Sequence, residues 1–179
     1  MIRILKQKEI KEILFHGRNA PEYEITKILD ELGKNNPTIY RLIYGESTDA
    51  IKRINKEMTY LYINLAVEMV FVFRKAFGKP PVVNNEEEWV LKQLSLIDIE
   101  LKSITKEIPM NDKFRIKLQE RLIKMGTSSK IQFELLEYLE NEVTKYVSSK
   151  AERKTAIYMV NNLLYVFVRL MGDFYNLKK

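Results

Sequence analysis

Few residues in this sequence combine the types and spacing that catalysis or metal binding requires. The chain has one histidine, His16, and no cysteine, which excludes disulfides and thiolate zinc sites. It also lacks a glycine-rich phosphate loop, a nucleophile elbow and a run of paired aspartates. Glu68 interrupts an apolar stretch, and we interpret it as half of a structural ion pair with Arg74 or Arg169 rather than a ligand contact. We therefore expect no enzymatic activity, no cofactor and no metal site.

The acidic run Glu86–Glu88 follows Asn84 and Asn85, either of which could cap a helix. Negative side chains in the first turn of a helix complement the positive end of its dipole. This structural role is a better interpretation of the three glutamates than an acidic active site. His16, near the end of the first expected helix, is interpreted in the same way as a C-terminal capping residue.

Polar side chains that could recognise a partner lie in Glu24–Tyr44, which has the spacing of two short helices joined by a turn. The first helix has an apolar face, and Gly33 stands just past it, where a chain can leave a helix through a left-handed residue. Asn36 followed by Pro37 is a helix-start signal. The apolar faces of the two helices consist of Ile25, Ile28, Leu29 and Leu32, then Ile39, Leu42 and Ile43.

This stretch resembles the helix-turn-helix of transcriptional regulators over about Glu22–Ile51. The run Pro37–Tyr40 is similar to the start of the recognition helix in TetR-like and PadR-like repressors. The positions that match the motif are Ile28, Leu32, Gly33, Ile39 and Leu42. The resemblance implies that the second helix enters the major groove of double-stranded DNA. The candidate DNA contacts are then Asn35, Asn36, Thr38, Tyr40, Arg41 and Tyr44.

Within this set, Arg41 is the best candidate for a base edge, because a guanidinium can bind guanine with two hydrogen bonds. Asn35 and Asn36 could instead hold backbone phosphates. Two short helices and a glycine turn also occur in helical proteins that bind no DNA. The alternative function is therefore a non-enzymatic helical interaction subunit of a larger protein or nucleoprotein assembly.

Hydrophobic periodicity predicts an all-α fold, with a three-helix head at residues 1–46 and a helical bundle at residues 47–179. The head would begin with a helix at Ile2–His16 that ends at Gly17. A turn is expected at Gly45, followed by a helix that Ser47 or Thr48 caps. No residue breaks the helical pattern from there to Phe77. Further helices are expected from Asn85 to the break at Pro109 and over Asp112–Met125, Ile131–Val147 and Lys150–Tyr175.

Two segments of these helices, Tyr60–Phe73 and Ile157–Val168, are apolar on nearly every side. Such a helix must be surrounded by protein. The two segments could lie at the centre of the bundle, or they could also form a subunit interface, since exposed apolar stripes favour association. We expect a homodimer through the final helix, with a contribution from Tyr60–Phe73.

The 179 residues carry a formal net charge of +6, which mildly favours nucleic acids or other acidic partners. Residues 1–56 hold 11 Lys and Arg against 8 Asp and Glu, so positive charge is denser in this first part of the chain. The start of the chain lacks the apolar core of a secretory signal, and Tyr60–Phe73 is too short to span a membrane. We expect a cytoplasmic protein with no membrane partner. Abundant Lys, Ile and Glu without Cys fits a thermophilic source.

Overall fold

The computed structural model describes residues 2–105 and 131–177, together with residues 111, 113, 116, 117 and 120. Every regular element in these residues is helical, as the hydrophobic periodicity predicts. The elements are α1 (Gln7–Arg18), α2 (Glu22–Asn35), α3 (Pro37–Arg41), the π-helix η1 (Leu42–Glu46), α4 (Ser47–Ile54), α5 (Lys56–Phe77), α6 (Glu86–Thr105), α8 (Phe133–Ser148), the 3-10 helix η2 (Ala151–Ala156) and α9 (Ile157–Tyr175). The expected helix at Asp112–Met125 lies almost entirely outside the described residues.

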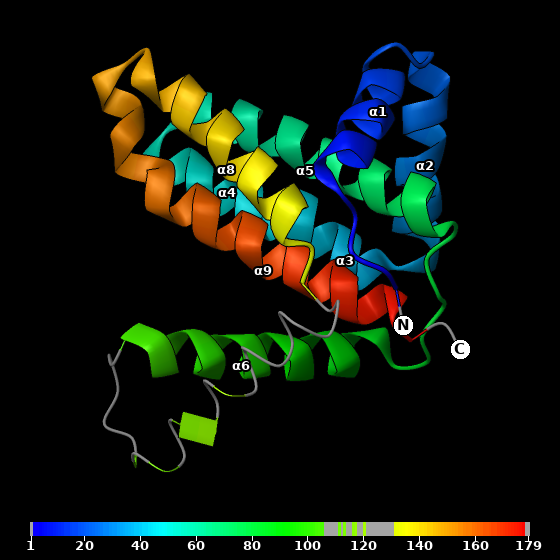
Figure 1. Cartoon of the computed structure of the whole chain (residues 1–179), viewed down its shortest axis with the longest axis vertical. Helices are drawn as coiled ribbons and strands as arrows, with labels where there is room; N and C mark the ends of the chain where they lie inside the picture. Colours follow the sequence, from blue (N-terminus) through cyan, green and yellow to red (C-terminus); the bar gives the residue numbers. More distant parts are fainter. Residues whose placement is uncertain are drawn as a thin grey trace.

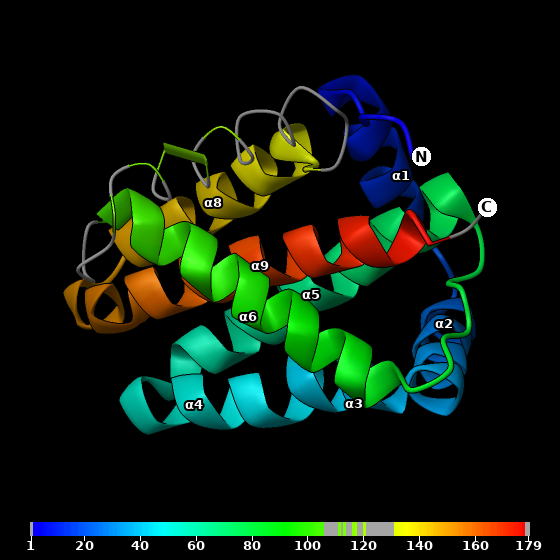
Figure 2. The same cartoon turned by 90° about the horizontal axis from the view of Figure 1, so that it is seen from below.

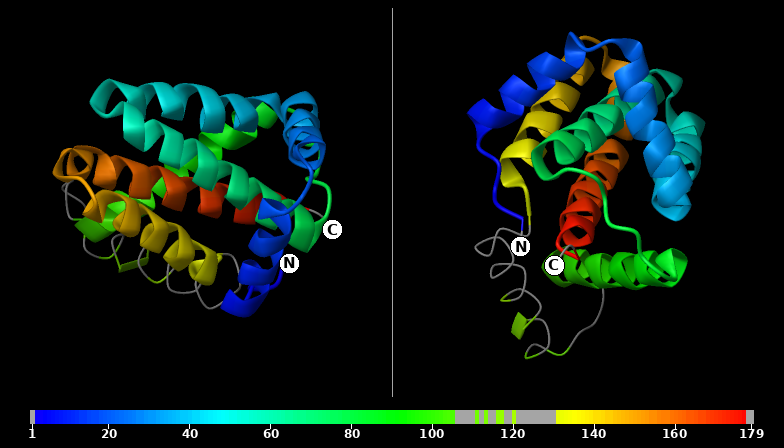
Figure 3. Two further views of the ribbon diagram at one scale, coloured as in Figure 1. Left: turned by 90° about the horizontal axis from the view of Figure 1, so that it is seen from above. Right: turned by 90° about the vertical axis from the view of Figure 1, so that its right-hand side faces the viewer.

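Two helical hairpins form the centre of the molecule. Helices α4 and α5 form the first hairpin, and α8 and α9 form the second (Figure 1). The order across the layer is α4, α5, α9, α8 (Figure 3, left). Helices α1 and α2 pack on α5 at one end of this layer, and α6 crosses α9 on one of its faces (Figure 2). The two helices with the most apolar sequences, α5 and α9, are therefore the two inner ones.

The second half of α5 confirms the prediction of a helix surrounded by protein. Five consecutive residues, Met69–Phe73, are buried, and α5 contacts α1, α2, α4, α8 and α9. Burial of each large apolar side chain contributes about 1.5–3 kcal/mol to stability. In α9 the enclosed stretch is Phe167–Gly172, which overlaps the predicted segment Ile157–Val168 only at its end. Within that segment only Val160, Leu164, Phe167 and Val168 are buried, so the chain does not surround the first half of α9 as it surrounds the second half of α5.

A single hydrophobic core runs through residues from both expected domains. It includes Leu5, Ile10 and Leu32 from the first range and Met69 and Val168 from the second. The two ends of the chain also meet, because the Ile2 amide donates to Asn176 Oδ1 at 2.7 Å. The proposed boundary at residue 46 falls at the last residue of η1, inside a helical rod that runs from Pro37 to Ile54.

Several of the predicted helix boundaries and caps are wrong. Helix α1 is shifted toward the C-terminus, and Gly17 lies inside it rather than ending it. No turn occurs at Gly45, because the rod continues there as the π-helix η1. Ser47 and Thr48 do not cap α4; their hydroxyls donate to carbonyls of the preceding turn, those of Leu42, Tyr44 and Gly45.

Another error is the helix predicted to continue unbroken to Phe77. Asn55 ends α4 with an extended backbone, and its side chain caps α5 by accepting from the Met58 amide at 3.1 Å. Asparagine is a strong N-cap residue because its short side chain reaches a free N–H of the first turn. The chain therefore reverses at Asn55 and forms the α4–α5 hairpin.

The predicted turn at Gly33 is also wrong, since α2 continues through this residue to Asn35. Among the described residues the only glycine with positive φ is Gly78, at 79°. A Cβ built on Gly33 would meet the Tyr40 ring at 3.5 Å, an ordinary contact. The turn lies at Asn36 instead, between α2 and Pro37, the residue that the sequence correctly predicts to begin the next helix.

Replacing Gly33 by Ala should raise the free energy of unfolding by up to about 1 kcal/mol, because alanine loses less backbone entropy in a helix. Urea denaturation followed by circular dichroism measures the change. Gly78→Ala is the matched control, and it should destabilise by about 1–3 kcal/mol because Gly78 has a left-handed φ. A loss of stability in Gly33→Ala as large as that in Gly78→Ala would mean that Gly33 is a turn residue.

Candidate functional site

The candidate DNA-binding motif is formed by α2, the turn at Asn36 and the α3–η1 segment. Leu32, Ile39 and Ile43 are buried on its inner side, as the apolar pattern predicts. The Asn36 amide donates to the Leu32 carbonyl at 2.7 Å and closes the end of α2. The two helices are thus joined by one residue, and Pro37 occupies the first helical position of α3, where its missing N–H leaves no bond unmade.

Asn36 does not have the role that its sequence position suggests. The residue is fully buried, and its side-chain amide donates to the Pro81 carbonyl at 3.1 Å, in the loop that precedes α6. The side chain makes no capping bond to α3. With no exposed surface, Asn36 cannot reach a phosphate in this conformation, and it instead fixes the turn against the loop.

Glu86 caps α3 in place of Asn36. Its two carboxylate oxygens accept from the Thr38 and Ile39 amides, each at 3.1 Å. The sequence interpretation assigned Glu86 to the dipole of its own helix, α6, but the carboxylate also reaches across to α3. Because the Thr38 amide is already bound and its side chain is half-buried, Thr38 offers little to a DNA backbone.

Arg41 stays on the surface but has acidic neighbours. Its Nε lies 3.4 Å from Glu46 Oε1, and its Nη2 lies 3.7 Å from Glu87 Oε1. The side chains of all three residues are more than 60% exposed. Ion pairs this long and this exposed contribute about 0–1 kcal/mol, so Arg41 can change partners at little cost.

The two tyrosines of the motif differ in their exposure. Their rings pack together, with centroids 5.0 Å apart, but Tyr40 is 37% exposed whereas the Tyr44 hydroxyl is buried. Burial raises the pKa of Tyr44 far above its usual value. Asn35, the last residue of α2, is exposed. Of the six candidate contacts, Asn35, Tyr40 and Arg41 are therefore exposed, whereas Thr38 and Tyr44 are half-buried and Asn36 is buried.

Glu86→Ala should lower the free energy of unfolding by about 1–2 kcal/mol, because it leaves two amides of α3 without their charged acceptor. Glu88→Ala is the matched control, since Glu88 is exposed in the same turn of α6 and forms no ion pair among the described residues. It should change stability by less than about 0.5 kcal/mol. Chemical denaturation of both variants measures the difference, and equal effects would contradict the capping role of Glu86.

A second polar cluster lies where α1, α5 and α8 meet. Glu68 accepts from Arg18 Nη2 at 2.8 Å and from the Tyr138 hydroxyl at 2.8 Å. The predicted ion pair of Glu68 is therefore confirmed as a pair, but both predicted partners are wrong: Arg74 binds Glu31, and Arg169 binds Glu100 and Asp173. No sequence signal identified Arg18, which is fifty residues away along the chain.

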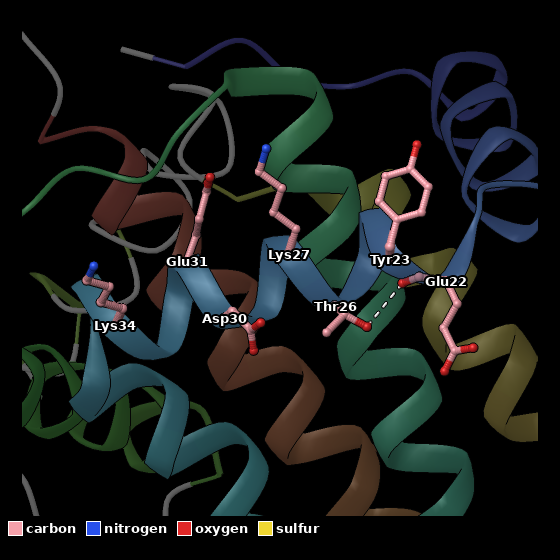
Figure 4. A pocket seen from close by; sticks show the side chains of 7 residues that line it. All are labelled: Glu22, Tyr23, Thr26, Lys27, Asp30, Glu31 and Lys34. Atoms are coloured by element: carbon pink, nitrogen blue, oxygen red, sulfur yellow. Dashed lines mark hydrogen bonds between the residues drawn. The ribbon is translucent and has the colours of Figure 1, made fainter.

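A groove of about 300 Å³ lies beside Glu68, between α1, α2 and α5. Its apolar lining includes Leu14, Ile25, Val67 and Phe71, and Arg18 and Glu68 line its polar side. A larger hollow lies on the outer face of α2. Its seven lining side chains all project from this one helix, including Tyr23 and Lys27 (Figure 4). Because no second element lines this hollow, it is an open surface rather than a cavity.

In the described residues, no group of three or more His, Cys, Asp or Glu side chains is arranged to hold a metal ion. One helical stretch, Ala151–Tyr175, is long and apolar enough to cross a membrane. Half of its most apolar window is buried inside the bundle, and core helices of soluble proteins have the same composition, so this observation is weak evidence for a membrane span.

The chain matches no protein-family model, no curated protein and no solved structure.

Proposed function

We propose that this chain is a DNA-binding transcriptional regulator that contacts duplex DNA through the α2–α3 motif. The observation that carries the proposal is the exposure of Arg41. This residue ends α3, the short helix that a single residue, Asn36, connects to α2. Tyr40 and Asn35 are exposed on the same motif. Arg41 can exchange its weak contacts with Glu46 and Glu87 for a phosphate or a guanine edge.

The proposal includes a homodimer, as the apolar segments of the sequence lead us to expect, and a location in the cytoplasm. Two copies of the motif would read two half-sites separated by about one turn of DNA, roughly 34 Å. The second half of α9 is buried within one chain, so dimerisation through this helix would use its first half, where Tyr158 and Asn162 are exposed. Size-exclusion chromatography with light scattering tests the oligomeric state.

Arg41→Ala tests the DNA-binding proposal. The variant should bind duplex DNA about 10- to 100-fold more weakly, because loss of a bidentate base contact costs about 1–3 kcal/mol. Gel mobility shift with a mixed-sequence duplex at low and moderate salt measures the change. Lys11→Ala, which removes one exposed charge from α1, is the control and should bind as the unmodified chain does. Equal affinity of the Arg41 and Lys11 variants would contradict the proposal.

A second function, the helical interaction subunit, is favoured by the acidic surroundings of the motif. Glu46, Glu86 and Glu87 lie around Arg41 and the start of α3, where they repel phosphate. Two aromatic side chains on α1 and α2, Phe15 and Tyr23, are each 73% exposed and could contact a protein partner. Absence of DNA binding by the purified chain at low salt would favour this function.

A further inference from the structure

The end of the bundle farthest from α1 and α2 is formed by two turns that touch. One turn joins α4 to α5 at Asn55, and the other joins α8 to η2 at Lys150 (Figures 2 and 3). The Asn55 side chain donates to the Glu152 carbonyl at 3.2 Å. Glu57 joins the same turns from α5, since it accepts from Lys150 Nζ at 2.9 Å and from Arg153 Nε at 2.7 Å. Residues 49–57 and 150–154 therefore form one surface, which we call the basic end.

Positive charge is concentrated at the basic end. Its two segments hold six Lys and Arg against three Asp and Glu, so they carry +3 of the chain's net charge of +6. Five of the six cations are exposed: Lys52, Arg53, Lys56, Lys150 and Lys154. Lys150 pairs with Glu57, while the other four form no ion pair within the part of the chain that the structure describes. An unneutralised cluster of this kind attracts a polyanion.

The basic end also continues the surface of the candidate motif. Helices α3, η1 and α4 form one rod, with Arg41 near its start and Lys52 and Arg53 near its end. Eleven residues separate Arg41 from Lys52, which corresponds to about 17 Å along a helix. Three glutamates surround the start of the rod. The end of the rod also has acidic neighbours, Asp49, Glu57 and Glu152, but among the described residues none of them forms an ion pair with its three cations, Lys52, Arg53 and Lys56. A phosphate backbone would therefore be held most strongly at the end of the rod.

We propose that the basic end is a phosphate-contacting surface for duplex DNA, with Lys52, Arg53 and Lys56 as its principal contacts. This inference rests on the proposed nucleic-acid function, but it does not require α3 to read bases. The contacts are to the backbone and carry no sequence preference of their own, so they add affinity and orientation. Tyr60 lies one turn beyond Lys56 on α5 and is 71% exposed, where its hydroxyl can donate to a further phosphate.

The side chains at the basic end fit a nucleic acid better than an anionic membrane. A peripheral membrane site combines basic residues with several large apolar side chains that enter the lipid. The basic end offers one exposed aliphatic side chain, Ile54, which is 43% exposed. Its exposed aromatic neighbour Tyr60 has a polar hydroxyl. The surface is thus a cluster of charges and hydroxyls that suits phosphates in water.

The experiment compares two triple variants that remove the same charge. Lys52→Ala/Arg53→Ala/Lys56→Ala alters the basic end, and Lys6→Ala/Lys8→Ala/Lys11→Ala alters exposed lysines of the α1 region. Fluorescence anisotropy with a labelled random-sequence duplex is recorded over a series of salt concentrations. The first variant should bind about tenfold more weakly or worse, and the slope of log affinity against log salt should fall by about 3. The second should change affinity by less than threefold or so, and thermal melts establish that both are folded.

The outcomes separate this inference from the proposed function. If the basic-end variant loses affinity while Arg41→Ala does not, the basic end binds DNA and the α2–α3 proposal fails. If Arg41→Ala loses affinity and the basic-end variant does not, the proposed function stands and this inference is overturned. Equal losses in both triple variants, or absence of duplex binding by the unmodified chain, would overturn it as well. Binding to phosphatidylserine vesicles through the same lysines, without binding to DNA, would assign the surface to a membrane instead.

Discussion

Replacing Arg169 by Met should lower the free energy of unfolding by about 3–5 kcal/mol, because it leaves a buried carboxylate without its counter-charge. Arg169 is among the largest fully buried side chains, with 2% exposure, and Glu100 is 1% exposed. Nη2 of Arg169 lies 3.5 Å from Glu100 Oε2, and Nη1 lies 3.1 Å from Asp173 Oδ2. Denaturation in urea, with the midpoint and slope compared between variants, measures the loss.

The double variant Arg169→Met/Glu100→Leu separates the ion pair from general packing. An apolar pair of similar volume is often as stable as the buried ion pair it replaces, so the double variant should recover most of the loss. Arg74→Met is a second control, since Arg74 also pairs with a glutamate but is 21% exposed, and its loss should be smaller. A loss below about 1 kcal/mol in Arg169→Met, or a double variant whose loss equals the sum of the single losses, would contradict this account.

The Arg169–Glu100 pair also connects the core to the candidate site. Glu100 lies on α6, the helix whose first residue, Glu86, caps α3. Loss of the pair weakens the attachment of α6 to α9 and thereby the position of Glu86 beside the motif. Amide hydrogen exchange in Arg169→Met should therefore increase at the start of α3 as well as along α6.

The elements that the sequence predicted well are those fixed by local chemistry. Pro37 begins α3 because its ring fixes φ near the helical value. The N–H that proline lacks would have no partner within the helix at this first position, so no hydrogen bond is lost. The central positions of α5 and α9 follow from the apolar composition of both helices on every face. Gly33 and Gly45 were misleading because glycine is permitted inside a helix as well as at its end, and its type alone does not distinguish the two.

The parts of the site that could not be predicted depend on partners far apart in the chain. Glu86 caps α3 across 48 residues, and Arg18 pairs with Glu68 across 50. A helical periodicity shows which side chains face the core, but it does not show which helix they meet there. Asn36 illustrates the consequence: its type suits both a cap and a phosphate contact, yet the loop at Pro81 buries it. The exposure of Asn35, Tyr40 and Arg41 could be predicted from the sequence, because the spacing of apolar residues in a helix indicates which side chains face solvent.

Raising the pH above about 10 should unfold this protein steeply, because at least four tyrosines remain protonated in the native state. Burial raises the pKa of Tyr44, Tyr62, Tyr138 and Tyr175 well above the ordinary value. The Tyr62 hydroxyl also donates to the Ile43 carbonyl at 3.0 Å, and that of Tyr175 donates to the Gly78 carbonyl at 3.2 Å. Tyrosines of the unfolded chain ionise near pH 10, whereas these four do not.

The stability that these tyrosines contribute is therefore fully present below about pH 10 and is lost as the pH rises through the folded-state values. Each tyrosine contributes about 1.4 kcal/mol per pH unit, so the four together should lower the free energy of unfolding by about 5 kcal/mol per unit. Urea denaturation at a series of alkaline pH values measures this slope. The ultraviolet absorbance of tyrosinate in the native state checks that the four residues remain protonated.

Tyr62→Phe and Tyr23→Phe provide the matched comparison. Loss of the hydrogen bond to Ile43 should make Tyr62→Phe about 1 kcal/mol less stable than the parent at neutral pH. Above about pH 10 its stability should fall by about 1.4 kcal/mol less per pH unit than that of the parent, since one tyrosine fewer ionises on unfolding. The Tyr23 side chain is 73% exposed, so Tyr23→Phe removes no buried hydroxyl and should retain the parent slope. Equal slopes for the two variants would show that the Tyr62 hydroxyl is accessible to water, and the enclosed centre of the bundle around α5 would then be incorrect.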